Sequence, residues 1–254
     1  MKGRQDLPFP VSYDKRERIR MKIPISKRLL ACASYVRQGA RLADVGCDHG
    51  YLGIYLLKEG IASYIVASDL RPQPLQKARE NAVRFGTDDR MEFHVADGLA
   101  AVQPQQVDTI VCAGMGADSM IEILEAAPWI RQEDVHLILQ PQTSGQALRG
   151  WLSEHRFAIL REMLLEENGY LYTVLEAVYT GREEPLSPGR QFVTEHLLQE
   201  NSPLLPLYLK RLSAGMERAV VGLRKGADDP QKLWYYETAL SEIEEMRKTY
   251  GKSE

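Results

Sequence analysis

The sequence predicts an α/β fold in which helices cover both faces of a mostly parallel sheet, followed by a helical C-terminal part. Residues 41–179 alternate short apolar runs with amphipathic runs, which is the pattern of a βαβ repeat. The runs after residue 189 are amphipathic with helical spacing. At 254 residues, the chain is long enough for one large domain and a small second one.

The elements follow one another in a regular order. Residues 1–22 are basic, contain two prolines, and are expected to form a disordered extension. A helix is expected over residues 26–37, with Ser26 as its cap. Five strands, nearly continuously apolar because both faces of a parallel sheet are covered, are expected at residues 41–46, 63–69, 91–96, 107–113 and 135–141. Four further helices are expected at residues 51–58, 73–85, 117–127 and 145–155.

The end of this repeat has a different pattern. Residues 157–166 and 170–179 are two long runs joined by Glu167, Asn168 and Gly169. Asn-Gly is the strongest short signal for a β-hairpin. The sheet is therefore expected to end in an antiparallel pair, which is unusual for a classical NAD-binding domain.

The C-terminal part begins after a proline-containing linker, residues 181–189. Apolar residues then recur with the heptad spacing of a coiled coil, at Leu205, Leu209, Leu212, Met216, Ala219 and Leu223. A second stripe consists of Leu233, Tyr236, Leu240, Ile243 and Met246. The two stripes predict an antiparallel helical hairpin, whose seam closes within one chain or between two. The expected domains are residues 23–180 and a helical coiled-coil domain at 187–250.

Composition and charge narrow the class of protein. No apolar run is long enough to span a bilayer, and three widely spaced cysteines suit a reducing cytosol rather than disulfides or a zinc site. We therefore expect a cytoplasmic protein with no membrane and no metal. The net charge is −3, but residues 1–30 hold nine Lys and Arg against three acids, and residues 206–225 hold five against one. Such local patches attract a phosphate backbone. Part of the second patch has an alternative explanation, because opposite charges also stabilise antiparallel helices.

Residues 41–50 carry the first functional signal, since a strand ends in Asp44 and Gly46 and turns into a helix. Glycines at such a turn allow backbone amides to approach a nucleotide-like ligand. Asp69 ends the second strand, and Asp97 the third. Open α/β sheets bind ligands at these carboxyl ends. A carboxylate at the second position can accept both ribose hydroxyls of an adenosine, and one at the third can accept the adenine amine.

The turn argues against NAD as this ligand. The dinucleotide fingerprint G-x-G-x-x-G is missing, because Asp48 stands where a glycine is required. A carboxylate there leaves little room for a pyrophosphate. S-adenosylmethionine has no phosphates, so it does not need the missing glycine. Its cationic sulfonium is compatible with the carboxylate of Asp48.

Three segments carry a specific resemblance: DVGCDHGYL at 44–52, AGMGAD at 113–118 and LILQPQ at 137–142. Together with the basic helical hairpin, they resemble the bacterial tRNA (adenine-N1)-methyltransferase family, over about residues 22–250. The resemblance implies a Rossmann-like class I methyltransferase fold, S-adenosylmethionine as donor, N1 of adenine 22 of tRNA as acceptor, and a C-terminal domain that helps to hold tRNA. Family members often have a glycine where this chain has Ala117.

The candidate site residues follow from these patterns. The expected cofactor-binding residues are Asp44, Gly46, Cys47, Gly50, Asp69, Leu70, Asp97, Gly98, Ala113 and Gly114. The expected catalytic residues are Asp48, His49, Tyr51 and Met115. Adenine N1 has a lone pair and no proton, so catalysis is expected to rest on positioning and on acceptors near the ring. The expected tRNA-binding residues are Lys27, Arg28, Lys210, Arg211, Arg218, Arg224 and Lys225.

Several roles have alternatives that the sequence leaves open. Asp48 either anchors the methionine amine or stabilises the developing ring charge. His49 and Tyr51 either contact the adenine, or are a turn residue and a packing residue. Gln140 and Gln142 either read the base edge or terminate a strand.

At the level of the whole chain, the main alternative is a class I methyltransferase of a small molecule or protein with a helical dimerisation tail. An RNA-binding protein with an inactive cofactor fold is disfavoured, because it would leave all three strand-end acids idle. Either a monomer or a weak homodimer is compatible with the helical stripes.

Overall fold

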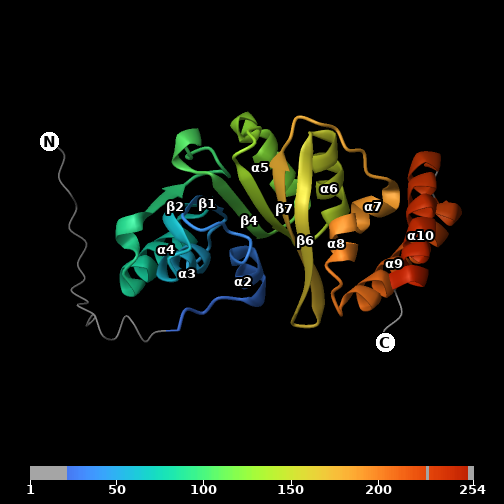
Figure 1. The fold of residues 1–254 in the computed structure, drawn as a ribbon, viewed down its shortest axis with the longest axis horizontal. Helices are drawn as coiled ribbons and strands as arrows, with labels where there is room; N and C mark the ends of the chain where they lie inside the picture. Colours follow the sequence, from blue (N-terminus) through green and yellow to red (C-terminus); the bar gives the residue numbers. More distant parts are fainter. Residues whose placement is uncertain (1–21, 227–228, 251–254) are drawn as a thin grey trace.

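The structure, a computed structural model, describes residues 22–226 and 229–250. Apart from Lys22, the predicted basic extension lies outside the described residues. Seven strands form one sheet in the order β3-β2-β1-β4-β5-β7-β6 (Figure 1). Their bounds are β1 Ala40–Val45, β2 Ala62–Asp69, β3 Met91–Val95, β4 Thr109–Met115, β5 His136–Pro141, β6 Phe157–Glu167 and β7 Tyr170–Tyr179. The first five strands are parallel, and β7 and β6 are antiparallel, so the predicted fold class is confirmed.

Helices cover both faces of this sheet. One core joins the sheet to α2 (Lys27–Ala33), α3 (Tyr51–Lys58) and α4 (Pro72–Phe85). A second core, on the other face, contains α5 (Ala117–Glu125) and α6 (Gly145–Glu154). Successive residues of β1 alternate between the two, with Leu42 in the first core and Ala43 in the second. This alternation is why the strands read as continuous apolar runs.

Two predicted boundaries differ from the structure. The helix expected over 26–37 ends at Ala33, where the Ser34 hydroxyl donates to the Ala31 carbonyl at 2.7 Å. The strand expected over 107–113 begins at Thr109 and continues to Met115. Its end contains a bulge at Gly114, which has a φ of +79° and shifts the register with β5. Met115 therefore belongs to a strand rather than to the loop that the sequence predicted.

The β6–β7 hairpin has the turn predicted from Asn168 and Gly169, both of which have positive φ. The pairing of β5 with β7 ends near Leu139 and Leu175, so the hairpin extends past the carboxyl end of β5. Figure 1 shows its tip at the lower edge of the molecule, between α2 and the beginning of α9. The longest strands of the sheet therefore project on the side where the parallel strands end.

The C-terminal part consists of α7 (Pro188–Phe192), α8 (Glu195–Gln199), α9 (Leu205–Gly226) and α10 (Pro230–Tyr250). They share a third core with Leu164 of β6, and α9 packs against α10 within the chain. The buried positions differ from the heptad seam, since Ser213 and Val220 are buried while Leu212 and Ala219 are half-buried. Ser213 faces α10 because its hydroxyl donates a hydrogen bond to Glu244 of that helix. Whether these helices form a domain of their own stays a prediction.

A buried ion pair joins the sheet to the C-terminal helices. Arg149 of α6 donates to Glu162 of β6, with 3.0 Å between Nε and Oε1, and also to the Thr173 hydroxyl at 3.0 Å. Glu162 accepts a further bond of 2.7 Å from Thr194, the cap of α8. Both charged side chains are almost completely buried. The network therefore fixes α8 against the sheet.

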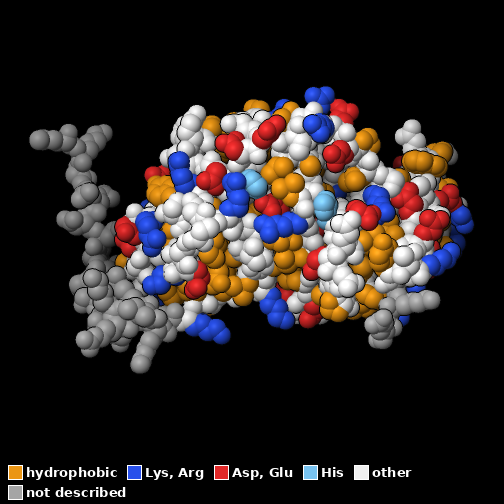
Figure 2. All heavy atoms as spheres, in the orientation of Figure 1, with side chains coloured by type: hydrophobic (Ala, Val, Ile, Leu, Met, Phe, Trp, Pro, Cys, Tyr) orange, Lys and Arg blue, Asp and Glu red, His pale blue; other side chains and the backbone are white. Residues whose placement is uncertain are grey.

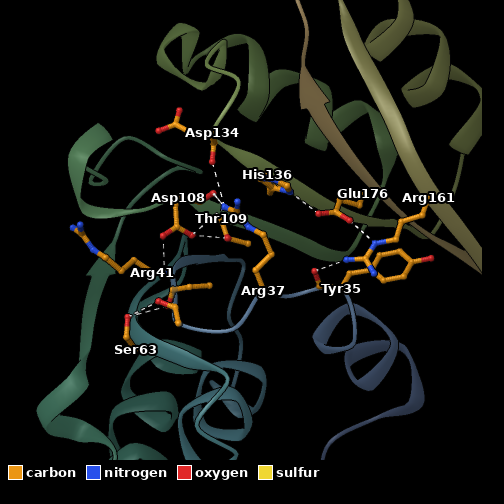
Figure 3. Close-up of polar contacts among 12 residues, drawn as sticks. Tyr35, Arg37, Arg41, Ser63, Asp108, Thr109, Asp134, His136, Arg161 and Glu176 are labelled. Atoms are coloured by element: carbon orange, nitrogen blue, oxygen red, sulfur yellow. Dashed lines mark hydrogen bonds and ion pairs between the residues drawn. The ribbon is translucent and has the colours of Figure 1, made fainter.

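A second polar network lies at the amino ends of the parallel strands (Figure 3). Glu176 of β7 binds both His136 at 2.6 Å and Arg161, whose guanidinium lies 4.2 Å from the centre of the Tyr35 ring. Arg161 also donates to the Tyr35 carbonyl at 2.9 Å. These contacts hold the segment after α2 to the sheet. Because the charges satisfy one another at the edge opposite the predicted cofactor site, we interpret the network as structural.

In residues 22–226 and 229–250, we find no helix with the length and apolar character that a membrane span requires.

Candidate functional site

A cavity of about 1150 Å³ opens at the carboxyl ends of the parallel strands. It brings together residues from the β1–α3 turn and from the segments that follow β2, β3 and β4, as the sequence predicted. Most of the expected cofactor-binding residues line it, namely Asp44, Gly46, Cys47, Asp69, Leu70, Asp97, Gly98, Ala113 and Gly114. Two of the expected catalytic residues, Asp48 and Met115, line it as well.

Three expected site residues are placed elsewhere. Gly50 has a φ of +71°, and a Cβ on it would lie 3.0 Å from Ala78, so it serves the close packing of α3 on α4. His49 is exposed, and its ring meets that of Tyr51 edge-on, 5.9 Å between centroids. Tyr51 packs against the first core. None of the three lines the cavity; a cofactor-binding role for Gly50 and roles for His49 and Tyr51 at the adenine stay predictions.

The β1–α3 turn uses its backbone amides internally. The amides of Gly46 and Cys47 both donate to the Ser68 carbonyl at 2.9 Å. The Asp48 amide donates to Asp69 Oδ2 at 3.2 Å. The expectation that the amides of this turn approach the ligand is therefore wrong for these residues. The amides of these three residues are not free to bind a pyrophosphate, which agrees with the argument against a dinucleotide.

Asp44 is the most unusual group in the cavity wall. Its side chain is buried, and its Oδ2 has no hydrogen-bond partner among the described residues. Burial raises its pKa to about 7; a hydrogen bond from the Gly53 amide opposes this shift, and the nearby charge of Asp69 adds to it. A buried, unpaired carboxylate oxygen is costly unless a donor reaches it. The site therefore favours a ligand that brings a cationic donor to Asp44.

Asp69 and Asp97 both line the cavity, where the sequence predicted acceptors for an adenosine. The carboxylate of Asp69 accepts the Arg71 amide at 2.9 Å through Oδ1 and the Asp48 amide through Oδ2. Each oxygen keeps capacity for a further bond, which suits a vicinal diol. Asp97 is exposed in the cavity, and Gly98 after it has a φ of +52°. A Cβ on Gly98 would lie 2.8 Å from Ile123, so only glycine fits between the β3 loop and α5.

The cavity continues past the expected cofactor-binding residues to a wall of which the sequence indicated only a part. Its lining there includes Ser26, Arg28 and Leu29 of the α2 region, and also Gln140 and Gln142. Buried Gln140 accepts the Gly114 amide at 3.1 Å and donates to the Pro141 carbonyl at 2.9 Å, so it fixes the bulge of β4. Gln142 is exposed, and its amide nitrogen lies near Gly114. The two glutamines after the fifth strand were the only signal for this wall.

The lining of the cavity also includes Glu122, Ile123 and Trp129. No sequence pattern marks them, because they reach the cavity only through the packing of α5 and the segment after it.

The expected tRNA-binding residues lie on two surfaces. Lys27 is exposed, and Arg28 pairs with Glu167 at 2.6 Å. The cations of α9 are all exposed: Lys210, Arg211, Arg218, Arg224 and Lys225. Figure 2 shows Lys and Arg side chains along the outer side of the C-terminal helices, among acidic ones. Arg224 pairs with Glu237 of α10 at 2.6 Å, so its charge serves the helix pair, as the structural alternative for this patch expected.

In the part of the chain that the structure describes, no group of three or more His, Cys, Asp or Glu side chains is arranged to hold a metal. The three cysteines are buried and unpaired, and burial raises the pKa of Cys32 and of Cys112 to about 12. They are therefore inert thiols at neutral pH.

Comparison with known proteins identifies the family. Residues 25–175 match the family described as methyltransferase domain. A putative tRNA methyltransferase of Mycoplasma pneumoniae is 32% identical over 68% of this chain and 81% of its own length. The crystal structure of a putative tRNA (m1A22) methyltransferase of Streptococcus pneumoniae is 32% identical, covers 87% of this chain and 98% of that one, and superposes with a TM-score of 0.75. The chain belongs to the bacterial tRNA (adenine-N1)-methyltransferase family.

Other members extend this family relationship. The tRNA (adenine(22)-N(1))-methyltransferase of Bacillus subtilis is 35% identical over 155 residues, which are 61% of this chain and 65% of that protein. The chain thus spans less than two thirds of that relative in the match. A crystal structure of the B. subtilis m1A22 tRNA methyltransferase TrmK covers 90% of this chain with a TM-score of 0.77 and 26% identity. The S. pneumoniae family member has also been solved in complex with S-adenosyl-L-methionine.

Proposed function

We propose that this protein transfers a methyl group from S-adenosylmethionine to N1 of adenine 22 of tRNA. The observation that carries the proposal is the cavity at the carboxyl ends of the strands, with acids at the ends of three successive strands and an unpaired buried oxygen on Asp44. Membership of the family supplies the reaction and the substrate, and the cavity supplies a matching set of groups.

The residues present fit the cofactor. Asp44 receives a cationic amine, which satisfies its orphaned oxygen and favours its charged form. Asp69 accepts the ribose hydroxyls, and Asp97 accepts the adenine amine. The cofactor supplies a methyl group on a positively charged sulfur, and no phosphate that would need the occupied amides of the β1–α3 turn.

The acceptor base belongs at the wall formed by α2 and the glutamines. Because N1 of adenine carries a lone pair, no general base is required, and the product ring becomes cationic. Gln142 and Asp48 are exposed at the cavity and provide oxygen acceptors for that charge. Gln140 fixes the bulge at Gly114, and Met115 packs against Gly46, so the β4 end presents a rigid surface to the transferred methyl group.

Replacing Gly46 by alanine is expected to weaken cofactor binding and to lower stability by about 1–2 kcal/mol, because a left-handed φ of +70° is strained for alanine. The new Cβ would also lie 2.9 Å from Met115 Cε. Gly39→Ala is the matched control, since Gly39 has a φ of +82° with nothing within 4 Å of the added carbon. Isothermal titration with S-adenosylmethionine should separate the two variants. Equal affinity for both would contradict the assigned packing of the turn.

The alternative of a small-molecule or protein methyltransferase has less support. A ribosomal protein L11 methyltransferase is 38% identical, but the match covers only 34% of this chain. The helical tail predicted for dimerisation packs α9 against α10 and buries much of its apolar seam within the chain, although Leu207, Val221 and Trp234 stay exposed. This favours a monomer, with a weak homodimer as the alternative. A tRNA substrate places the enzyme in the cytoplasm.

Methylation of unmodified tRNA transcripts with labelled S-adenosylmethionine tests the proposal. We expect 1-methyladenosine as the only labelled nucleoside, with loss of incorporation when adenine 22 is replaced by uracil. A different nucleoside product, or undiminished labelling of the replaced transcript, would overturn it.

A further inference from the structure

We propose that the tip of the β6–β7 hairpin is an RNA-binding surface on which an unpaired base of the tRNA stacks against Tyr170. The inference rests on the proposed tRNA substrate, and it assigns a contact to an element that lies outside both the cofactor cavity and the basic face of α9.

Tyr170 is presented to solvent by the geometry of the tip. Residues Asn168 and Gly169 form the tight turn, and Tyr170 is the first residue of β7. Its side chain is 67% exposed, although a tyrosine ring gains free energy when it is buried. Tyr172 lies beside it, with 6.4 Å between the ring centroids. A rigid turn therefore holds an uncovered aromatic ring with a second ring behind it.

One of the two acids of the tip, Glu167, is paired with a cation of the protein. Glu167 accepts bonds from the Lys27 amide at 2.7 Å and from Arg28 at 2.6 Å. Although burial works in the opposite direction, Arg28 and this amide hold the pKa of Glu167 below its usual value. Glu166 accepts the amide of Gly169 at 2.6 Å. Arg28 therefore compensates the charge of Glu167 at the place where a phosphate backbone would approach, whereas Glu166 is held by a neutral amide.

Cations from two separate elements meet at the tip. Lys27 Nζ of α2 lies 3.5 Å from the Glu166 carbonyl, and Arg211 of α9 donates to the Gly169 carbonyl at 3.2 Å. Both side chains are exposed. Lys and Arg side chains are visible at the lower edge of the molecule, where Figure 1 places the tip (Figure 2). The tip therefore connects the two basic surfaces that the sequence predicted as separate.

The position of the tip suits RNA entering the cavity. The hairpin projects past the carboxyl end of β5, on the side of the sheet where the cavity opens. Arg28 belongs to both places, since it lines the cavity and pairs with Glu167 while its guanidinium lies 4.9 Å from the centre of the Tyr172 ring. An exposed aromatic ring between cations is the arrangement by which proteins bind unpaired nucleotides. A nucleotide near the target base is thus within the reach of Tyr170.

The test compares tRNA binding by the full-length protein and its Tyr170→Ala variant, measured by fluorescence anisotropy with a labelled transcript. Stacking predicts a Kd roughly 5- to 100-fold higher for Tyr170→Ala, and a Kd within about twofold of wild type for Tyr170→Phe and Tyr170→Trp. Affinity for S-adenosylmethionine and the melting temperature should not change. Leu160→Ala is the control, because Leu160 is an exposed apolar residue (43%) of the same hairpin, on β6 and far from the tip.

A fully paired RNA duplex provides the second arm, and it should bind wild type and Tyr170→Ala with equal affinity. Equal tRNA affinity of wild type and Tyr170→Ala would overturn the inference, as would a loss in Tyr170→Phe as large as that in Tyr170→Ala. If the wild-type protein methylates and binds tRNA while Tyr170→Ala is unaffected, only this inference fails. If the wild-type protein neither binds nor methylates tRNA, the proposed function fails instead.

Discussion

The Asp44→Asn variant is expected to bind S-adenosylmethionine roughly 10- to 100-fold more weakly than wild type, because it removes a charge-assisted hydrogen bond in a buried site. The same substitution should stabilise the cofactor-free protein at pH 8. Its neutral amide has nearly the same shape as the carboxylate, but it does not place an unpaired charge in the interior. Binding is measured by isothermal titration, and stability by urea unfolding.

The pH dependence follows from the raised pKa of Asp44, about 7 when folded against an ordinary value of 3.8. When the pKa of an acid is raised by folding, its protonated form stabilises the folded protein. This contribution is complete below about pH 4 and is lost as the pH rises through 7. The stability advantage of Asp44→Asn should therefore grow with pH over this window, by up to about 4 kcal/mol.

Cofactor binding should show the opposite trend, because Asp44 must be ionised to hold a cation. Below about pH 7, the wild-type affinity is expected to fall as the pH falls, and binding should release a proton. The Asp44→Asn variant should lack this dependence on Asp44. A wild-type affinity that is constant between pH 5 and 8 would contradict the assigned role of this carboxylate.

The Glu162→Ala variant is expected to lose about 3–5 kcal/mol of unfolding free energy, because it leaves the guanidinium of Arg149 buried without its counter-charge. Burial alone would lower the pKa of Arg149, but Glu162 beside it keeps that pKa above its ordinary value. For a domain of this size the loss corresponds to a melting temperature lower by roughly 10 °C. Differential scanning calorimetry measures it directly.

Two further variants show how the effect of removing a buried ion pair differs from that of removing an exposed one. Glu183→Ala removes the partner of Arg156 in an exposed ion pair and should change stability by less than about 1 kcal/mol. Replacing both buried partners, Arg149→Met with Glu162→Leu, should cost less than Glu162→Ala alone. A double variant that is less stable than the single one would show that the bonds to Thr173 and Thr194, rather than charge compensation, dominate this network.

Most of the fold could be predicted because its signals are local. The strands alternate between two apolar cores, so each appears as a short apolar run with no interruption. The hairpin could be predicted from Asn168 and Gly169 alone, since this pair adopts the positive φ angles that the turn requires. The end of α2 at Ala33 could not be predicted, because Val36 is buried and continues the apolar pattern although it lies outside the helix. On α9, a polar bond from Ser213 to Glu244 displaced the buried positions from the heptad.

In the candidate site, too, some residues could be placed from local sequence signals and others could not. Acids at the ends of consecutive parallel strands must meet at one edge, which is why Asp44, Asp69 and Asp97 could be placed together from their spacing. Tyr51 could not be placed, because a residue that opens a helix can face the ligand or the core with the same spacing. Arg28 reaches the cavity through long-range packing of α2 on the β6–β7 hairpin, for which the sequence contains no pattern.

The occupied amides of the β1–α3 turn have a consequence for competition inside a cell. Nucleoside triphosphates and dinucleotides share the adenosine moiety with S-adenosylmethionine and are abundant metabolites. A pocket that recognised adenosine alone would be blocked by them. Here Ser68 already accepts the amides of Gly46 and Cys47, and the carboxylate of Asp48 stands at the same turn, so a polyphosphate at this turn meets a negative charge and two amides that are already bonded. We therefore expect this turn to disfavour adenine nucleotides that carry a polyphosphate.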